Sequence, residues 1–265
     1  MSLFPLRNLL SRRALIGNLV RRDFQQRYVG SSMGWLWGLV HPAVMLASYW
    51  FVFGHVFNQK AAPDSGTSSF ALYIFAGFLP WLLFQDSVQR SATSVVESSN
   101  LVTKTLFPSE VLPISIFFSN LLQHFLALLL LLGVVAVASQ KIEPAVALVP
   151  VYLIFLALFT VGISWLAAGL QVFLRDTSQA LAVIMTAWFW LTPIFFARDR
   201  LPPWMQPLAR VNPLAQVVDA YRHAILAGTL PSAGDFALLV GVSGVTFVLG
   251  GLFFRRTKRA FGDVL

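Results

Sequence analysis

The segment NLVTKTLFPSEVLP, residues 100–113, is a short polar-edged stretch between two hydrophobic spans. Asn100 is a favourable N-cap residue, and the residues after it predict a helix of about two turns that ends at Pro108. Ser109 and Glu110 then predict the start of a long, almost wholly apolar helix. A short rigid helix at a membrane face offers a contact to a protein outside the bilayer, so the segment predicts a coupling element.

The composition argues against a soluble protein. Of the 265 residues, 57% are hydrophobic and only 11% are charged, whereas soluble domains contain about 25% charged residues. The absence of cysteine excludes disulfides, thiolate metal sites and a cysteine nucleophile. The net charge of +8 is concentrated at the two ends of the chain. That distribution indicates membrane topology, with no role for nucleic acid.

Six apolar segments predict an all-α integral membrane protein with six transmembrane helices, because roughly 20 apolar residues cross a bilayer. They cover residues 37–57, 70–84, 111–138, 145–174, 180–197 and 236–254. An even number of spans places both termini on one side, and thirteen of the 19 Lys and Arg residues then lie on that side. By the positive-inside rule, both termini and the coupling segment are predicted to be cytoplasmic.

Three regions follow from this topology. Residues 1–36 are predicted as a cytoplasmic amphipathic segment, 37–254 as the six-span domain and 255–265 as a basic cytoplasmic tail. Six basic residues fall on the outer side: Lys60, Lys141, Arg198, Arg200, Arg210 and Arg222.

Residues 4–28 predict a helix that lies on the membrane surface. Its apolar side chains recur at helical spacing and are Leu6, Leu9, Leu10, Ile16, Val20, Phe24 and Tyr28. Arg21 and Arg22 lie elsewhere on the helix, whereas Arg13 and Arg27 fall near its apolar side. A basic anchor that only fixes orientation is the alternative interpretation.

The start of the first span has its own pattern. Gly30, Gly34 and Gly38 are spaced every four residues, which predicts that another helix approaches closely. Trp35 and Trp37 suit the headgroup boundary. The candidate residues of the surface helix and of this start are Arg21, Arg22, Arg27, Tyr28, Gly34 and Trp35.

The predicted outer loop between the last two spans contains a helix signal. Asn212 is an N-cap with Pro213 at the first helical position. An apolar stripe of Leu214, Val217, Val218, Tyr221 and Ile225 follows and ends at Gly228. Asp219 and Arg222 are predicted to lie on its polar side. A helix that dips into the outer interface and a surface helix that merely closes the loop are both open, and its candidate residues are Asn212, Pro213, Tyr221 and Arg222.

No catalytic or metal site is predicted. The eleven carboxylates are dispersed, and the four histidines match no metal-ligand spacing. No Gly-Lys pair occurs, so a phosphate-binding P-loop is absent and no nucleotide cofactor is expected on this chain. His124 lies inside the third span and is either functional or, as we prefer, a neutral histidine bonded to a neighbouring helix.

Five motifs together carry a family resemblance. They are RDFQQRYVGSSMGWLWGLVHP (22–42), NLVTKTLFPSEVLP (100–113), FLRDTSQAL (173–181) with TPIFF (192–196), NPLAQVVDAYRHAIL (212–226) and FRRTKRAFGDVL (254–265). In order and spacing, the chain resembles the permease subunits of bacterial polysaccharide and polyol-phosphate ABC exporters, of O-antigen, capsule or teichoic acid type. The resemblance covers essentially the whole chain.

The resemblance implies a homodimer in the bacterial inner membrane that exports a lipid-linked glycan. Two separate ATPase subunits would bind the ATP and Mg²⁺, which fits the missing P-loop. The coupling segment would then dock into a groove of the ATPase, whereas packing on the membrane face is the alternative. The candidate ATPase-coupling residues are Asn100, Leu101, Val102, Lys104, Leu106, Phe107, Pro108 and Glu110.

The aromatic content of 14% suggests a way to handle sugars. Aromatic faces stack on sugar rings without demanding one linkage, which lets a polymer slide. The alternative is that these side chains only face lipid or the membrane boundary. The candidates for lining a pore are Tyr49, Trp50, Phe53, Trp81, Trp188 and Trp190.

Three functions are compatible with this sequence. An exporter permease for a polysaccharide or polyol-phosphate polymer is the leading one. An ABC exporter of drugs or lipids would share the architecture, and only the motifs speak against it. A membrane-embedded glycan-modifying enzyme would need a catalytic cluster, which the dispersed carboxylates do not provide.

Overall fold

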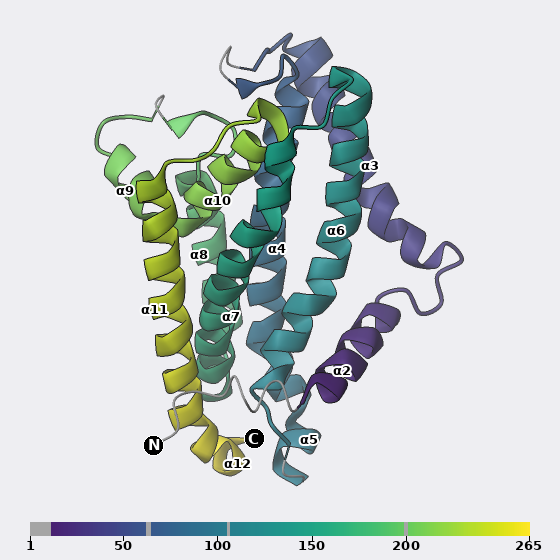
Figure 1. The fold of residues 1–265 in the computed structure, drawn as a ribbon. Helices are drawn as coiled ribbons and strands as arrows, with labels where there is room; N and C mark the ends of the chain where they lie inside the picture. Colours follow the sequence, from purple (N-terminus) through teal and green to yellow (C-terminus); the bar gives the residue numbers. More distant parts are fainter. Residues whose placement is uncertain (1–11, 62–64, 105–106, 199–200) are drawn as a thin grey trace.

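The protein is a helical bundle, shown in Figure 1. The computed structural model describes residues 12–61, 65–104, 107–198 and 201–265. Within these residues every regular element is a helix, and the only strand-like pairing is an isolated bridge between Lys60 and Ser69. The prediction of an all-α protein is therefore confirmed.

Five helices in the described part are long and apolar enough to cross a membrane. The first joins α3 (Trp37–Tyr49) to the π-helical turns η2 (Trp50–Val56). The others are α4 (Phe70–Glu97), α6 (Val111–Ser139), α7 (Val149–Phe173) and α11 (Ala233–Thr257). These five match five of the six predicted spans.

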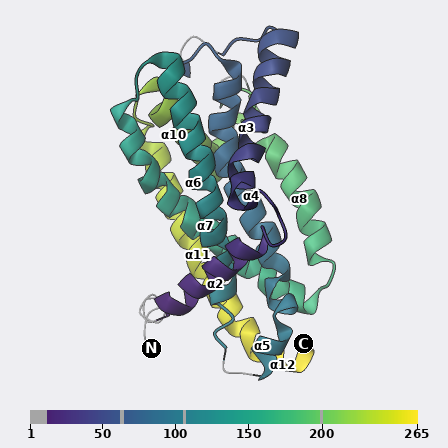
Figure 2. The same cartoon turned by 90° about the vertical axis from the view of Figure 1, so that its right-hand side faces the viewer.

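The remaining predicted span, residues 180–197, corresponds to a shorter helix. Here α8 (Thr177–Leu191) has 15 residues, fewer than the roughly 20 that cross a bilayer. Figure 2 shows α8 at the edge of the bundle, and only Leu181 and Met185 of its side chains are buried. Residues 192–197 after it are irregular, and α9 (Gln206–Val211) and α10 (Pro213–Arg222) follow further along the chain.

The centre of the bundle is α4, in which 78% of the residues of an apolar 18-residue stretch are buried. It packs against α3, α6, α7, α8 and α10. Phe75, Phe84 and Trp81 of α4 are 0%, 0% and 1% exposed. Most of the apolar side chains of α4 are therefore enclosed by neighbouring helices.

The close contact of α7 with α11 depends on two glycines. A Cβ atom on Gly162 would lie 2.6 Å from the carbonyl oxygen of Thr246, and one on Gly250 would lie 2.2 Å from that of Gly162. Small residues let helix backbones approach in this way. The predicted close contact at Gly30, Gly34 and Gly38 is wrong for the first two, because their φ values of 79° and 53° place them in a turn before α3.

The N-terminal helix is shorter than predicted over the described residues. It is α2 (Arg13–Gln26), which packs against α6. Ile16 contacts the core, whereas Leu6, Leu9 and Leu10 lie outside the described residues. Figure 1 shows α2 at the same end of the bundle as α5 (Ser99–Lys104) and the C-terminal α12 (Phe261–Val264).

The α7–α11 contact is tested by Gly250→Ala. The added methyl group must push the two backbones apart, so we expect a loss of about 1–3 kcal/mol in the free energy of unfolding. A Cβ on Gly244 of the same helix meets nothing within 4 Å, so Gly244→Ala is the matched control. Denaturant titration of the purified chain in detergent measures both, and equal stabilities would contradict the contact.

Candidate functional site

The predicted coupling helix is present, with different boundaries. Helix α5 begins at Ser99, directly after α4, and its described part ends at Lys104. The carbonyl of Ser98 accepts bonds from the N–H groups of Leu101 and Val102 at 2.9 and 3.1 Å. Asn100 is therefore the second residue of the helix, and its prediction as the N-cap is wrong, because the end of α4 leads directly into α5.

Residues 107–110 of the coupling segment, before the start of α6, are not helical. Phe107 lies outside the helix, contrary to prediction, since Pro108 disfavours the helical conformation of the residue before it. Leu106 and the side chain of Lys104 lie outside the described residues. Val102 and Phe107 pack against the subunit's own core, whereas Leu101 is 39% exposed.

Glu110 joins the coupling segment to three distant parts of the chain. Its carboxylate forms an ion pair with Lys258, in the turn after α11. A second ion pair, of 2.9 Å, joins it to Arg12 just before α2. Its backbone carbonyl accepts a hydrogen bond of 3.1 Å from Trp165 Nε1 of α7. The start of α6 is thus fixed to both ends of the described chain.

The pKa of Glu110 reflects these contacts. Burial alone raises it, but the hydrogen bond from Lys258, a backbone hydrogen bond and the charges of Lys258 and Arg12 together hold the pKa below its ordinary value. A carboxyl group with a lowered pKa stabilises the fold above its unfolded pKa. That stabilisation is lost as the pH falls through its folded pKa.

The C-terminal helix completes this end of the molecule. Helix α12 packs against α5, and Phe261 is 1% exposed. The Phe261 ring contacts those of Phe254 and Phe173, with centroids 5.5 and 6.1 Å apart. We name α5, Glu110 and α12 the coupling end. The contacts of Glu110 with Arg12, Trp165 and Lys258 were missed by sequence reasoning, because nothing in the sequence marked these residues as its neighbours.

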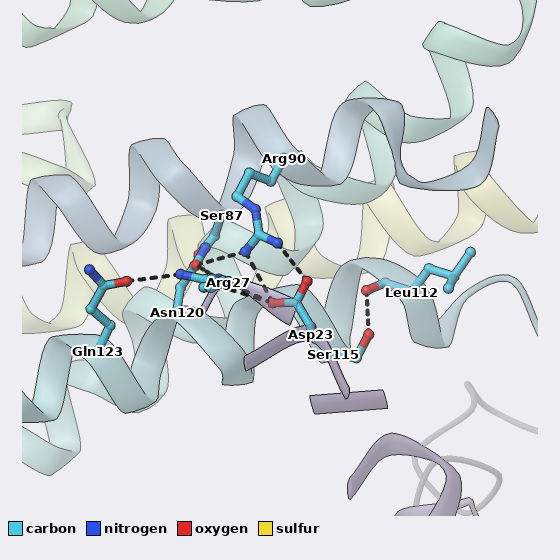
Figure 3. A network of polar contacts seen from close by, with 8 residues as sticks. All are labelled: Asp23, Arg27, Ser87, Arg90, Leu112, Ser115, Asn120 and Gln123. Carbon is cyan, nitrogen blue, oxygen red and sulfur yellow. Dashed lines mark hydrogen bonds and ion pairs between the residues drawn. The ribbon is translucent and has the colours of Figure 1, made fainter. Parts of the chain in front are cut away.

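A polar network fixes α2 to α4 and α6, as Figure 3 shows. Asp23 of α2 forms ion pairs with Arg27, at 3.2 Å, and with Arg90 of α4. Both arginines also donate to the side-chain oxygen of the buried Asn120 in α6, and Arg27 Nη1 donates to Gln123 Oε1 at 2.8 Å. One carboxylate therefore holds two guanidinium groups between three helices.

The other candidates on the surface helix do not enter this network. Arg21 and Arg22 are exposed, and Trp35 is 56% exposed beside Gly34 in the turn. Tyr28 is half-buried, with its ring 5.2 Å from that of Phe24. Arg27, which was also predicted, connects α2 to α6 through its hydrogen bond to Gln123.

Five of the six aromatic candidates lie in one group of rings between η2, α3, α4 and α8. Tyr49 contacts Phe53, and the group continues through phenylalanines to Trp81, Trp188 and Trp190. Trp81 is 1% exposed and Trp190 is 59% exposed. Trp50, 54% exposed, lies apart and contacts His55 at 4.2 Å between ring centroids.

The helix predicted after Asn212 is present as α10, with Asn212 as its cap. The Asn212 side chain accepts a bond of 3.1 Å from the N–H of Leu214, and the helix continues through the turns of η6 (His223–Ala227) to Gly228, whose φ is 67°. Its apolar stripe is 0–1% exposed. Tyr221 bonds His124 Nε2 at 2.9 Å, which agrees with the preferred interpretation of that histidine.

Arg222 lies in the interior, so its prediction on a polar helix face is wrong. It is 5% exposed and donates hydrogen bonds to the carbonyls of Tyr73, Pro193 and Ile194, at 3.2 and 2.8 Å for the first two. Its guanidinium also lies 3.7 Å from the centroid of the Tyr73 ring. The sequence did not reveal that the irregular segment after α8 presents carbonyl groups to this position.

Comparison with known families identifies the fold. A family model described as "ABC-2 type transporter" matches residues 14–226. The chain belongs to the ABC-2 type transporter family. The match includes α2 through α10 and therefore the first part of the coupling end, whereas Lys258 and α12 lie beyond it.

Relatives within this family are similar over almost their whole length. The chain is 28% identical to the O-antigen export system permease protein RfbA of Myxococcus xanthus over 97% of both chains. It is 26% identical to RfbA of Klebsiella pneumoniae over 93% of both. The polysialic acid transport protein KpsM of Escherichia coli is 21% identical, over 91% of this chain and 93% of its own.

Within the described ranges, no group of three or more histidines and carboxylates is placed to hold a metal ion. The ionic groups instead connect helices: Glu110 holds the coupling end of this ABC-2 transporter, and Asp23 holds α2. Figure 1 shows α2 and α5 towards the same end of the bundle.

The Glu110–Lys258 pair is tested by Glu110→Gln and Lys258→Met. Each is expected to lose about 1 kcal/mol of stability at neutral pH, because the pair is partly exposed. The double variant should lose less than the sum. Thermal unfolding at several pH values measures this, and the deficit of Glu110→Gln should vanish below the folded pKa of Glu110. Additive losses that do not change with pH would contradict the ion pair.

The α2 network is tested by Asp23→Asn. Removing the shared carboxylate leaves two half-buried guanidinium groups facing each other. The free energy needed to detach α2 should therefore fall by about 1–2 kcal/mol, which raises the detached population roughly tenfold. Trypsin cleavage at Arg21 and Arg22, followed by mass spectrometry, reports the detachment. Arg13→Gln, at an exposed position on the same helix, is the control. Unchanged cleavage in Asp23→Asn would exclude a holding role.

Proposed function

We propose that the chain is the membrane-spanning permease subunit of an ATP-driven exporter of a lipid-linked polysaccharide. The observation that carries this proposal is similarity over nearly the whole chain to proteins named O-antigen export permease and polysialic acid transport protein. The bundle of long apolar helices supports a membrane location, which we place in the bacterial inner membrane.

The motor of this exporter is a pair of separate ATPase subunits, which would bind ATP and Mg²⁺. The chain has no Gly-Lys pair and hence no P-loop of its own. We assign the coupling end as the docking surface. Leu101 offers exposed apolar surface there, while Glu110, Lys258 and Arg12 connect the segment to the rest of the bundle. Displacement of α5 can thus move α4 and α6, between which it lies in the chain.

The proposed topology has six spans with both termini in the cytoplasm. In it, α8 together with the irregular segment after it forms the fifth span, even though the helix alone is short. Residues 37–254 are then the six-span domain, and 255–265 the cytoplasmic basic tail. The clusters of arginine at both ends of the chain support this orientation.

A second copy of the chain would complete the pathway. Helices α3 and α8 leave large apolar side chains exposed, among them Val44, Val183 and Ile184 at 59%, 71% and 53%. We propose that the polymer passes near these helices, where the exposed rings of Trp50 and Trp190 can stack on sugars. Trp81 and Trp188 would then support the rings from within the subunit.

Co-expression with an ATPase subunit tests this function. The purified chain alone should hydrolyse no ATP, whereas the complex should hydrolyse ATP and restore surface polysaccharide to cells that lack the permease. Robust hydrolysis by the isolated chain, or a failure of any polysaccharide ABC exporter ATPase to form a complex with it, would count against the proposal.

The docking surface is tested in the same complex by Leu101→Asp. A charge on this exposed apolar side chain should weaken ATPase binding by about 1–3 kcal/mol and reduce export in proportion. Gln140→Glu adds the same charge at an exposed position after the far end of α6, outside the coupling end, and serves as the control. Export and complex formation at the unmodified level in Leu101→Asp would remove α5 from the docking surface.

A further inference from the structure

A cavity of about 750 Å³ lies beside α9 and α10, towards the end of the bundle away from the coupling end (Figure 1). None of the coupling or network residues described above lines it. The polar lining that matters here comes from six residues: Tyr73, Arg198, Arg210, Asp219, Arg222 and His223.

The lining carries more positive than negative charge. Three arginines face one carboxylate, that of Asp219, in the wall of the cavity. Asp219 pairs with Arg198 at 3.0 Å and lies 3.8 Å from Arg222. Asp235, outside the lining, pairs with Arg198 at 3.0 Å as well. Even when both carboxylates are included, one cationic charge of the lining has no counter-charge among the residues that the structure describes.

Two of the arginines are fixed in position before any ligand arrives. Arg222 is held by three backbone carbonyls and the Tyr73 ring, as described above. Arg198 is held by its two carboxylates, yet its Nε atom is buried and has no hydrogen-bond acceptor in the part of the chain that the structure describes. A buried donor without an acceptor is costly, so an oxygen atom of a ligand or of water is expected beside it.

The third arginine is free to move onto a ligand. Arg210 is exposed, and no ion pair involves its guanidinium among the described residues. Its backbone carbonyl is fixed by Gln216 Nε2 at 2.8 Å, so the start of its side chain is positioned at the cavity. His223 adds an exposed imidazole, whose Nδ1 contacts Thr229 Oγ1 at 2.7 Å.

This combination favours an oxyanion. A neutral sugar would gain nothing from the unbalanced guanidinium charge, whereas phosphate oxygens match the paired donors of arginine. The space is large enough for a diphosphate with part of its substituents. We propose that this cavity binds a phosphate group, carried by the lipid diphosphate of the exported glycan or by a phospholipid headgroup. The first source rests on the proposed function, and the second does not.

Arginine-specific labelling tests the site in the permease–ATPase complex in phosphatidylcholine nanodiscs. Phenylglyoxal modifies exposed arginines, and mass spectrometry of the peptides gives the rate at each one. Inorganic pyrophosphate, added at matched ionic strength, should slow modification of Arg210 roughly tenfold at near-saturating occupancy. The rates at Arg255 and Arg256, exposed at the other end of α11, should stay unchanged.

Two variants connect the protection to the cavity. In a complex that still assembles, Arg198→Gln should abolish the protection of Arg210. Lys60→Gln removes an equal charge from an exposed position outside the lining, and should preserve the protection.

The outcomes separate the sources of phosphate. Protection by pyrophosphate supports the diphosphate of the substrate. Protection only when phosphatidylglycerol is added to the nanodiscs supports a lipid headgroup. Protection by neither, equal protection of Arg255, or full protection in Arg198→Gln would overturn the site. Because labelling requires neither hydrolysis nor export, a protected complex that exports no polysaccharide would refute the proposed function and leave the phosphate site standing.

Discussion

Within a bilayer, every backbone N–H and C=O group needs a partner inside the protein, and this requirement shapes the whole bundle. Long helices meet it by themselves, which is why α4, α6, α7 and α11 need little besides apolar packing. The chain is no longer helical in residues 192–197. One side chain supplies hydrogen bonds to backbone carbonyl groups there. Arg222 donates to the carbonyls of Pro193 and Ile194 and to that of Tyr73 in α4. A charged residue at the end of α10 thus permits an irregular segment inside the bundle.

The opposite end is organised by a different interaction. The carboxylate of Glu110 gathers cationic groups from the beginning and the end of the described chain, and α12 packs against α5 beside it. A six-residue helix is too short to be stable alone, so its position depends on these contacts. The proposed transmission of force from an ATPase therefore rests on residues from α2, α7 and the C-terminus as much as on the coupling segment itself. Asp23 adds a second ionic attachment nearby, between α2 and α4.

The two ends of the bundle use arginine in different ways. Near the coupling end, Arg27 and Arg90 share one carboxylate and an amide, and their role is to hold helices together. Around the cavity beside α9 and α10, Arg198 and Arg222 are equally well held, yet within the described ranges the lining keeps an uncompensated charge and Arg210 forms no ion pair. That difference in charge balance separates a structural network from a proposed binding site.

By itself, the sequence determined the helical membrane class, the family, the position of the coupling segment and the Asn212 cap of α10. These features arise from local composition and from contacts between residues close in the chain, which periodicity and capping rules describe. Only the tertiary structure decided which polar groups meet. It made Asn100 an interior helix residue, moved Phe107 out of α5 and enclosed Arg222. It also paired Glu110 with Lys258, 148 positions away. Such partners depend on how helices far apart in sequence pack, and no local pattern encodes that distance.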